Sequence, residues 1–275
     1  MRQLQPPPYL PIPLPQVDLA VADGDKMYLD SDAHYLSVGM SALAVIERAL
    51  GGAKPRSILD LPSGFGRVTR FLRARYPRAA ITASDLDRDG VDFCTARFGA
   101  RAAYSVRDFR DLRLGDTYDL IWVGSLITHL PTAQTGCFFE AMARHMTWRS
   151  TLVVSSHGPS IIPRLLNSGY GLQPAEAAAV VQEYEQAGFG YRDYLSGGEE
   201  YGVALTNEHY GISLIGEAWL RDKLPRWGLR LDDYAVRAWD DHHDVVVVRL
   251  QEARSPAQTP AGGFGRRMLR ALLHR

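Results

Sequence analysis

Cysteine is scarce in this sequence, and so are long apolar runs and any excess of charge of one sign. The two cysteines, Cys94 and Cys137, form no Cys-x-x-Cys pair, which argues against a zinc site or a disulfide framework and favours a reducing, cytoplasmic compartment. No run approaches the roughly 18 apolar residues that a transmembrane helix needs. Lys plus Arg and Asp plus Glu each number 31, so no overall field favours nucleic acid as a partner.

The composition that remains, 46% hydrophobic and 23% charged, is typical of a globular domain. Six prolines between Pro6 and Pro15 interrupt any apolar helix, which excludes a secretory signal and predicts an extended arm over residues 1–25. Residues 26–252 suffice for one α/β domain. Residues 253–275 predict a flexible basic tail. Its last segment, FGRRMLRALLHR, could instead form a short helix on a partner or an anionic membrane surface.

Short apolar runs alternate with helical stripes along most of the central domain. The runs expected to form strands are residues 57–61, 79–84, 102–106, 118–123 and 151–155. Such alternation predicts crossover connections and a parallel sheet covered by helices on both faces. Two further strands, 231–238 and 245–250, are joined by the short segment WDDHHD and must therefore be antiparallel. The sequence thus predicts a doubly wound, mostly parallel seven-stranded α/β sheet, similar to a Rossmann sheet, that ends in an antiparallel hairpin.

Residues 157–213 interrupt the alternation and are expected to be an insert after the fifth strand. The insert has one helical stripe, residues 174–186, among loops rich in glycine and tyrosine. Ligands of such sheets bind at the carboxyl ends of the strands, so we expect the insert to be a substrate lid. The alternative is a structural addition on the solvent side. Under the lid hypothesis, the expected substrate-binding residues are Tyr201, His209 and Tyr210.

The turn after the first strand is the strongest local signal. Gly64 and Gly66 would let the backbone approach a ligand, and the following helix offers unpaired N–H groups. A nicotinamide-dinucleotide loop uses a similar turn, but its third small residue is replaced here by Thr69. The loop also opens with Asp60 and Pro62, which disfavours a pyrophosphate ligand.

Three acidic residues follow three successive strands. Asp85 ends the second strand, where a carboxylate can accept hydrogen bonds from both ribose hydroxyls, and Asp108 follows the third. Asp60 precedes the glycine turn and suits a cationic group. Each acid alone would be interpreted as a helix cap or a solvated loop charge. Their combination with the glycine turn points to one ligand at the carboxyl edge.

In this combination the sequence resembles the class I S-adenosylmethionine-dependent methyltransferases. The segments that carry the resemblance are residues 58–66, 81–87, 107–109 and 118–131. More narrowly, ILDLPSGFGRVTRFL, ASDLDRDGVDFC and YGISLIGEAWL resemble a bacterial group that accompanies glycosyltransferases. The resemblance implies that Asp60, Gly64, Gly66, Asp85 and Asp108 bind the cofactor. It also implies a sugar or glycan hydroxyl as acceptor and a glycosyltransferase as a candidate partner.

The expected contacts with S-adenosylmethionine come from four parts of the chain. The cofactor-binding set is Asp60, Pro62, Ser63, Gly64, Phe65, Gly66, Asp85, Leu86, Asp108, Phe109 and Ser125. Asp60 would meet the ammonium group, Asp85 the ribose, and Asp108 the adenine amine, with Phe109 supplying its backbone N–H and a packing surface. Pro62 stands where many relatives have a less rigid residue.

Methyl transfer to an alcohol needs a base that takes the hydroxyl proton. We expect His157, which follows the fifth strand, to be this catalytic base, and His129, after the fourth strand, to be the second candidate. His129 has an alternative role as a structural buttress. His209 is a third candidate base.

The run from Asp240 to Asp244, with His242 and His243 between, has the composition of a metal site. Adjacent residues on a turn are expected to point in different directions, however, so we expect a solvated turn and assign no metal ligand. A magnesium requirement stays open as an alternative.

The leading hypothesis is an O-methyltransferase for a saccharide or a glycosylated small molecule. The alternative enzyme methylates nitrogen or carbon of a small-molecule natural product. The Asn/Asp-Pro-Pro-aromatic loop of many amine methyltransferases is replaced here by residues 125–128, which disfavours a nucleic-acid amine. A third hypothesis is a non-catalytic, cofactor-binding module that partners a glycosyltransferase.

Overall fold

The computed structural model describes residues 1–3, 17–29, 31–194 and 210–251. Its main sheet has the order β10-β11-β7-β6-β3-β4-β5. These strands are β3 (Ser57–Asp60), β4 (Ala80–Asp85), β5 (Arg101–Tyr104), β6 (Leu120–Val123), β7 (Thr151–Ser156), β10 (Leu229–Trp239) and β11 (His243–Leu250). Strands β3 to β7 are parallel, and β11 lies antiparallel between β7 and β10. The predicted doubly wound sheet with a terminal hairpin is confirmed.

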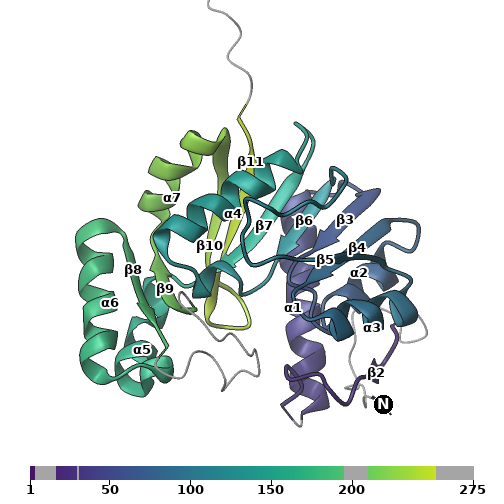
Figure 1. Cartoon of the computed structure of the whole chain (residues 1–275), viewed down its shortest axis with the longest axis horizontal. Helices are drawn as coiled ribbons and strands as arrows, with labels where there is room; N and C mark the ends of the chain where they lie inside the picture. Colours follow the sequence, from purple (N-terminus) through teal and green to yellow (C-terminus); the bar gives the residue numbers. More distant parts are fainter. Residues whose placement is uncertain (4–16, 30, 195–209, 252–275) are drawn as a thin grey trace, which may run out of the picture.

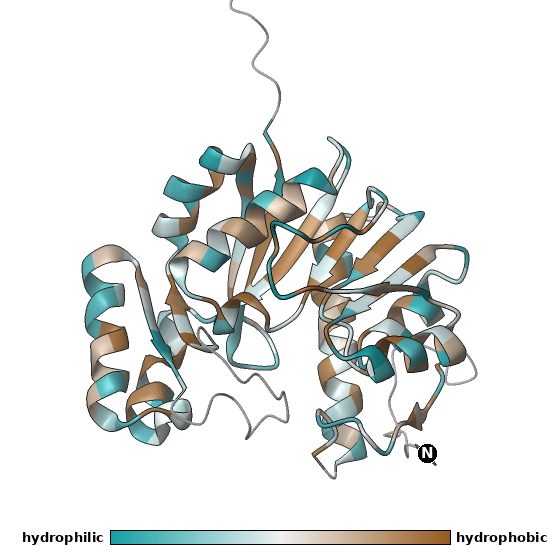
Figure 2. Cartoon of the chain, viewed as in Figure 1, coloured by the Kyte–Doolittle hydropathy of each residue, from teal (hydrophilic) through white to brown (hydrophobic). Residues whose placement is uncertain are grey.

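Successive side chains along the strands point to opposite faces of the sheet and pack in two separate apolar layers. Ile58 points into the layer under α1, α2 and α3, and its neighbour Leu59 points into the layer under α4 and α7. The helices are α1 (Asp32–Leu50), α2 (Thr69–Arg75), α3 (Arg88–Phe98), α4 (Thr132–Arg144) and α7 (Glu217–Lys223). Figure 1 shows these two groups of helices on opposite sides of the sheet, and Figure 2 shows the apolar strands between them.

Short polar residues and glycines set the helix boundaries. Helix α1 begins at Asp32, because the Ser31 hydroxyl accepts the His34 N–H and caps the helix. Gly51 ends α1 in the left-handed conformation that favours glycine. Asp87 caps α3 in the same way as Ser31 caps α1, accepting from the N–H groups of the next turn. This cap fixes the helix that packs on the glycine turn.

The insert forms a small unit with its own apolar core. It contains α5 (Ile162–Ser168), α6 (Pro174–Ala187), and an antiparallel pair of strands, β8 (Phe189–Asp193) and β9 (Gly211–Ile215). Helix α6 confirms the predicted stripe, whereas the β8–β9 pair was missed because its tyrosines and glycines suggested loops. Figure 1 shows the unit as a lobe beside the β10–β11 end of the sheet. Tyr201 and His209, expected to bind substrate, lie outside the described residues.

Part of the predicted N-terminal arm packs on the domain. Strand β1 (Arg2–Gln3) pairs with β2 (Ala20–Val21), and Val17 and Val21 are buried in the layer under α1. The Arg70 guanidinium, itself buried, donates to the carbonyl oxygens of Asp18 and Ala20. The packed domain therefore begins no later than Val17, before the predicted boundary at residue 26. None of the described helices has the length and hydropathy needed to cross a membrane. The predicted basic tail, residues 253–275, is outside the described part of the chain.

Candidate active site

The turn between β3 and α2 leaves one side open at Gly64. Gly64 has a φ of 48°, and a Cβ placed there would meet no atom within 4 Å. Gly66 differs, because a Cβ there would lie 2.3 Å from the Phe98 ring and 2.9 Å from Cys94 Sγ. Gly66 was expected to let a ligand approach. The structure shows that it lets α3 approach, so only Gly64 faces open space.

Asp60 is a buried carboxylate at the end of β3. It is 1% exposed, and the Thr69 hydroxyl donates to it at 2.5 Å. Burial raises the pKa of Asp60 to about 7, the Thr69 hydrogen bond opposes that rise, and the nearby Asp85 carboxylate adds to it. A cation beside Asp60 would offset the cost of burying its charge.

Asp85 ends β4 and accepts two backbone hydrogen bonds. The N–H of Gly64 donates to it at 2.7 Å and the N–H of Asp87 at 2.9 Å. Burial raises the pKa of Asp85, and these backbone bonds oppose the rise. Leu86, next along the chain, exposes 44% of its surface and can contact a ligand beside Asp85.

Asp108 lies on a more open part of the edge. Its carboxylate pairs with the Arg110 guanidinium at 2.6 Å, and hydrogen bonds from that side chain lower the pKa of Asp108 to about 2. Phe109 turns inward and packs edge-on against Phe138 with ring centroids 5.6 Å apart. Phe109 therefore offers packing from the core side. If Asp108 accepted a hydrogen bond from an adenine amine, its carboxylate would bind both that amine and Arg110.

Of the remaining predicted cofactor residues, Pro62, Ser63 and Phe65 lie in the glycine turn and Ser125 follows the neighbouring strand β6. The Leu61–Pro62 peptide bond is cis, and the N–H of Ser63 donates to the Ser84 carbonyl in β4. Phe65 lies 5.9 Å from Phe93 of α3, measured between ring centroids. Ser125 follows β6 and has a φ of 53°. Its backbone N–H donates to the Ser155 hydroxyl at 2.7 Å.

These residues fit S-adenosylmethionine. The ligand has an ammonium group, a sulfonium and two ribose hydroxyls, and the edge offers the buried Asp60 and the half-buried Asp85 beside an open glycine. The Thr69 hydrogen bond offsets only part of the cost of burying the Asp60 charge, and a cation would offset more of it. Asp60 can hold the ammonium and Asp85 the ribose.

Arg67 is a further cation at this turn that the sequence analysis missed. Its guanidinium lies 5.9 Å from the centre of the Tyr35 ring and interacts with Asp240 and Asp25. Burial lowers the pKa of Arg67. A guanidinium in this place suits the carboxylate of the methionine moiety. Because the partners of Arg67 come from distant segments, no local pattern marked it.

His129 joins the end of β6 to the insert. It lies in the 3₁₀ turn Ile127–His129, and its Nδ1 lies 2.8 Å from the Gly211 carbonyl oxygen of β9. Because a carbonyl only accepts, Nδ1 carries the proton and Nε2 keeps a lone pair. Burial lowers the pKa of His129 to about 4, so the ring is neutral at pH 7. Tyr210, predicted to bind substrate, stacks on this ring with a centroid distance of 4.6 Å.

His157 lies beyond β7 in a group of histidines. It is 3% exposed and stacks on His243 with a centroid distance of 4.9 Å. Burial lowers the pKa of His157 well below its usual value, with His129 and His242 contributing in the same direction. His242 and His243 were expected to point in different directions, but their ring centroids lie 4.0 Å apart.

Asp244 holds the hairpin against the loop after β7. It is fully buried and accepts from the Tyr234 hydroxyl at 2.5 Å and from the Arg237 N–H at 2.8 Å. Gly158 has no room for a Cβ, which would lie 1.8 Å from Asp244 Oδ2. The close approach of Gly158 and Asp244 places the neighbouring residues His157 and His243 against each other.

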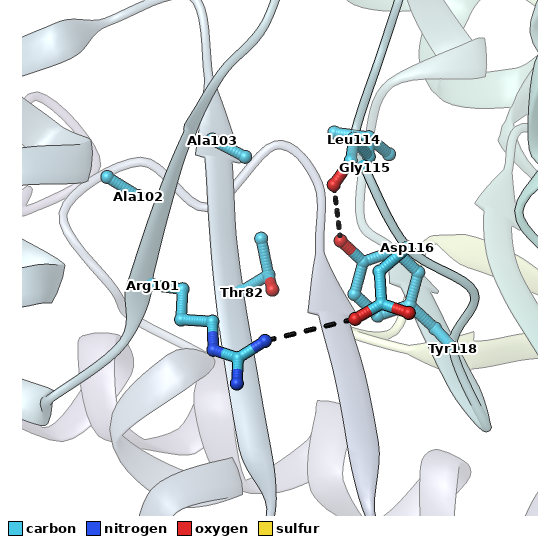
Figure 3. Close-up of a pocket in the computed structure, with 8 residues that line it drawn as sticks. All are labelled: Thr82, Arg101, Ala102, Ala103, Leu114, Gly115, Asp116 and Tyr118. Atoms are coloured by element: carbon cyan, nitrogen blue, oxygen red, sulfur yellow. Dashed lines mark hydrogen bonds and ion pairs between the residues drawn. The ribbon is translucent and has the colours of Figure 1, made fainter.

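A shallow pocket of about 150 Å³ lies elsewhere, between β4, the start of β5 and the segment before β6. Figure 3 shows Arg101 paired with Asp116, and the Tyr118 hydroxyl directed at the Leu114 carbonyl. Thr82 and Arg101, which line the pocket, are register partners near the amino ends of their strands. The pocket therefore lies away from the glycine turn and from the histidines.

One family model matches part of the chain. Residues 58–148 match a family model described as a methyltransferase domain. This range runs from β3 through α4 and includes the glycine turn, Asp85, Asp108 and His129. No curated protein matches the sequence.

Solved structures share the fold at low sequence identity. An S-adenosylmethionine-dependent methyltransferase from Clostridium acetobutylicum superposes with a TM-score of 0.52 at 14% identity, over 79% of this chain and 92% of the other. The 1,6-didemethyltoxoflavin-N1-methyltransferase of Burkholderia thailandensis gives 0.54 at 14% identity, over 79% and 80%. A mitomycin 7-O-methyltransferase gives 0.50 at 14% identity, over 78% of this chain and 53% of the other. These likenesses show the fold.

Proposed function

We propose that this chain is an S-adenosylmethionine-dependent methyltransferase that methylates a hydroxyl group of a small molecule, with saccharides and glycosylated compounds as the first acceptor class to test. The observation that carries the proposal is the neutral imidazole of His129 at the carboxyl edge, with its Nδ1 proton committed to Gly211. An alcohol acceptor needs a proton acceptor, whereas a neutral amine can react before it loses its proton.

Bound S-adenosylmethionine supplies an electrophilic methyl group on a sulfonium. Asp60 would hold the ammonium group of the cofactor and Asp85 its ribose, both at the glycine turn, and the insert would present the acceptor. The acceptor oxygen forms the new bond to the methyl carbon as the carbon–sulfur bond breaks, with its electron pair going to sulfur. The hydroxyl proton goes to Nε2 of His129. Alignment of the two reactants supplies much of the acceleration.

His129 is favoured over His157 as the base because of access and tautomer. His129 is partly exposed, and its Nδ1 bond fixes the lone pair on Nε2. His157 is 3% exposed and stacked against another imidazole. A base must come within hydrogen-bond distance of the proton that it removes. His157, the first candidate from the sequence, stays in the proposal as the residue beside the acceptor.

The insert is proposed to be the acceptor wall. Tyr194 and Tyr210 gather around His129, with the Tyr194 ring centroid 6.0 Å away and its hydroxyl 3.4 Å from His129 Nδ1. Aromatic rings with a polar end suit a partly stacked, hydroxylated ligand. The resemblance to the group that accompanies glycosyltransferases has no support from the comparisons. The proposal therefore includes no glycosyltransferase partner.

Acceptor screening tests the proposal. The purified chain is incubated with S-adenosylmethionine and separate panels of saccharides, phenols, aliphatic alcohols and amines, and mass spectrometry detects the gain of one methyl group. We expect methylation of a hydroxyl compound, with S-adenosylhomocysteine released in equal amount and both reduced in Asp85→Ala at subsaturating cofactor. Methylation restricted to amines or carbon acids would overturn the O-methyl proposal. Cofactor binding without turnover on any panel would favour a non-catalytic module.

A further inference from the structure

The register between β7 and β11 places two histidines opposite each other. Asp244 is paired with Ser156 and Val245 with Ser155, in antiparallel order. The next pair in this register is His243 with His157, immediately beyond the end of β7. Cross-strand neighbours in this arrangement have their side chains on the same face of the sheet. Their stacked rings follow from the strand pairing.

Each of these two buried rings has a nitrogen that lacks a hydrogen-bond partner. Among the described residues, His157 Nδ1 and His243 Nδ1 are fully covered and contact no donor or acceptor. The two side chains are 3% and 5% exposed. An unsatisfied buried polar atom carries the cost of its lost hydration, and native structures seldom leave one without a compensating ligand.

His242 adds a third nitrogen from the hairpin turn. Its Nδ1 lies 2.5 Å from the Asp240 carbonyl oxygen, so Nδ1 carries the proton and Nε2 keeps a lone pair. One nitrogen from each of His157, His242 and His243 lies within 4.8 Å of the other two. Three nitrogens within this distance of one another can converge on a single ion.

The geometry points to a binding site for a divalent transition metal ion, with Zn²⁺ as the best fit, formed by His157, His242 and His243. Four-coordinate zinc with bonds of about 2.0–2.1 Å places its nitrogen ligands about 3.3 Å apart, so the rings need only small movements. Neutral imidazole is the ligand that zinc, cobalt and nickel share, whereas magnesium and calcium prefer oxygen. The nearest carboxylate on β11, Asp244, is engaged by Tyr234 and Arg237.

Three protein ligands leave a fourth position on zinc for water or a substrate oxygen. Ser125 lies at this end of the sheet, with its hydroxyl 3.3 Å from His243 Nε2. Such a contact orients a ligating ring through its second nitrogen. A role for the ion in holding the acceptor hydroxyl rests on the proposed function, whereas metal binding itself does not.

Metal titration of the full chain tests the site. After removal of metals with a chelator, Zn²⁺ is titrated by calorimetry into the wild-type protein, His242→Gln and the control His34→Gln, in which an exposed histidine of α1 is replaced. We expect one equivalent of Zn²⁺ to bind wild type and the control equally, and His242→Gln to bind at least about tenfold more weakly. No saturable binding, or equal binding by His242→Gln, would overturn the site.

A spectroscopic measurement covers the case in which His242→Gln does not fold. Co²⁺ bound to wild type is expected to give the intense visible absorption of a four-coordinate site, and only the weak bands of hydrated six-coordinate Co²⁺ would overturn the proposal. Circular dichroism and S-adenosylhomocysteine binding monitor the fold of each variant. Metal binding that depends on His242 would stand even if no hydroxyl acceptor is methylated, so the two proposals fail separately.

Discussion

The imidazole of His129 is stacked on the ring of Tyr210, with ring centroids 4.6 Å apart and an angle of 26° between the planes. The same imidazole bonds the Gly211 carbonyl through Nδ1. One side chain at the end of β6 therefore both fastens the insert and presents Nε2 at the carboxyl edge. These two roles can be separated, because only Nδ1 contacts the insert backbone.

His129→Asn is expected to keep the insert in place and lose the base, since the asparagine amide can donate to Gly211 much as Nδ1 does. Turnover on a hydroxyl acceptor should fall by about 100-fold or more, with cofactor affinity unchanged. His145→Asn is the matched control, because His145 Nδ1 also lies 2.8 Å from a backbone carbonyl, that of Asp116. Normal turnover of His129→Asn would remove His129 from the chemistry.

Asp85→Ala is expected to weaken cofactor binding by about 1.5–3 kcal/mol, the range for a charge-assisted hydrogen bond. Calorimetry with S-adenosylhomocysteine measures the change. Asp92→Ala is the control, since Asp92 is an exposed carboxylate of α3 whose partner is the Tyr104 hydroxyl. Equal affinities of Asp85→Ala and wild type would show that Asp85 does not bind the ribose.

Asp60 should couple cofactor binding to pH. Its pKa of about 7 means that the carboxyl is largely protonated below pH 7, and a bound ammonium favours the carboxylate. Binding should therefore release a proton at pH 6, and affinity should rise with pH up to about 7 and then level off. Calorimetry at pH 6 in two buffers of different ionisation enthalpy measures this release. Release that persists in Asp60→Asn would assign the proton to another group.

The stability of the ligand-free protein should change with pH in the opposite direction. The folded pKa of Asp60 lies above the value of 3.8 for an unperturbed carboxyl, so the folded state binds more protons between pH 4 and 7. The stabilising contribution of Asp60 to the free energy of unfolding is then fully present below pH 4 and is lost as the pH rises through 7. Denaturant unfolding of wild type and Asp60→Asn at pH 5 and pH 8 isolates this contribution.

The two glycines of the turn should respond differently to alanine. Both have positive φ and would pay about 1 kcal/mol of backbone strain. Gly66→Ala would also force Cβ against Phe98 and Cys94, and we expect a further loss of about 1–3 kcal/mol in unfolding free energy. Gly64→Ala should instead lower cofactor affinity, because its Cβ would project into the open space in which the cofactor is expected to bind. Equal stabilities of the two variants would contradict this assignment.

Local sequence patterns predicted most of the main sheet because each strand and helix carries its own signal. Ile58 and Leu59 alternate between two apolar layers, and Ser31, Asp87 and Gly51 mark helix boundaries through their own backbone contacts. The β8–β9 pair was not predicted because its two strands pair only with each other, in a sheet separate from the main one. Tyr194 and Tyr210, which flank the pair, pack within the insert and around His129.

The sequence alone determined the sheet and the predicted place of the cofactor, since the carboxyl ends of parallel strands meet at one edge and carry Asp60 and Asp85 there. Tertiary structure decided which side chains face each other across that edge. The pairing of β11 with β7 stacks His243 on His157, although 85 residues lie between them in the sequence. No local pattern in the sequence indicates that the two histidines meet. Strand register is a long-range property, fixed by packing and hydrogen bonds between distant segments, so it has no signature in either segment alone.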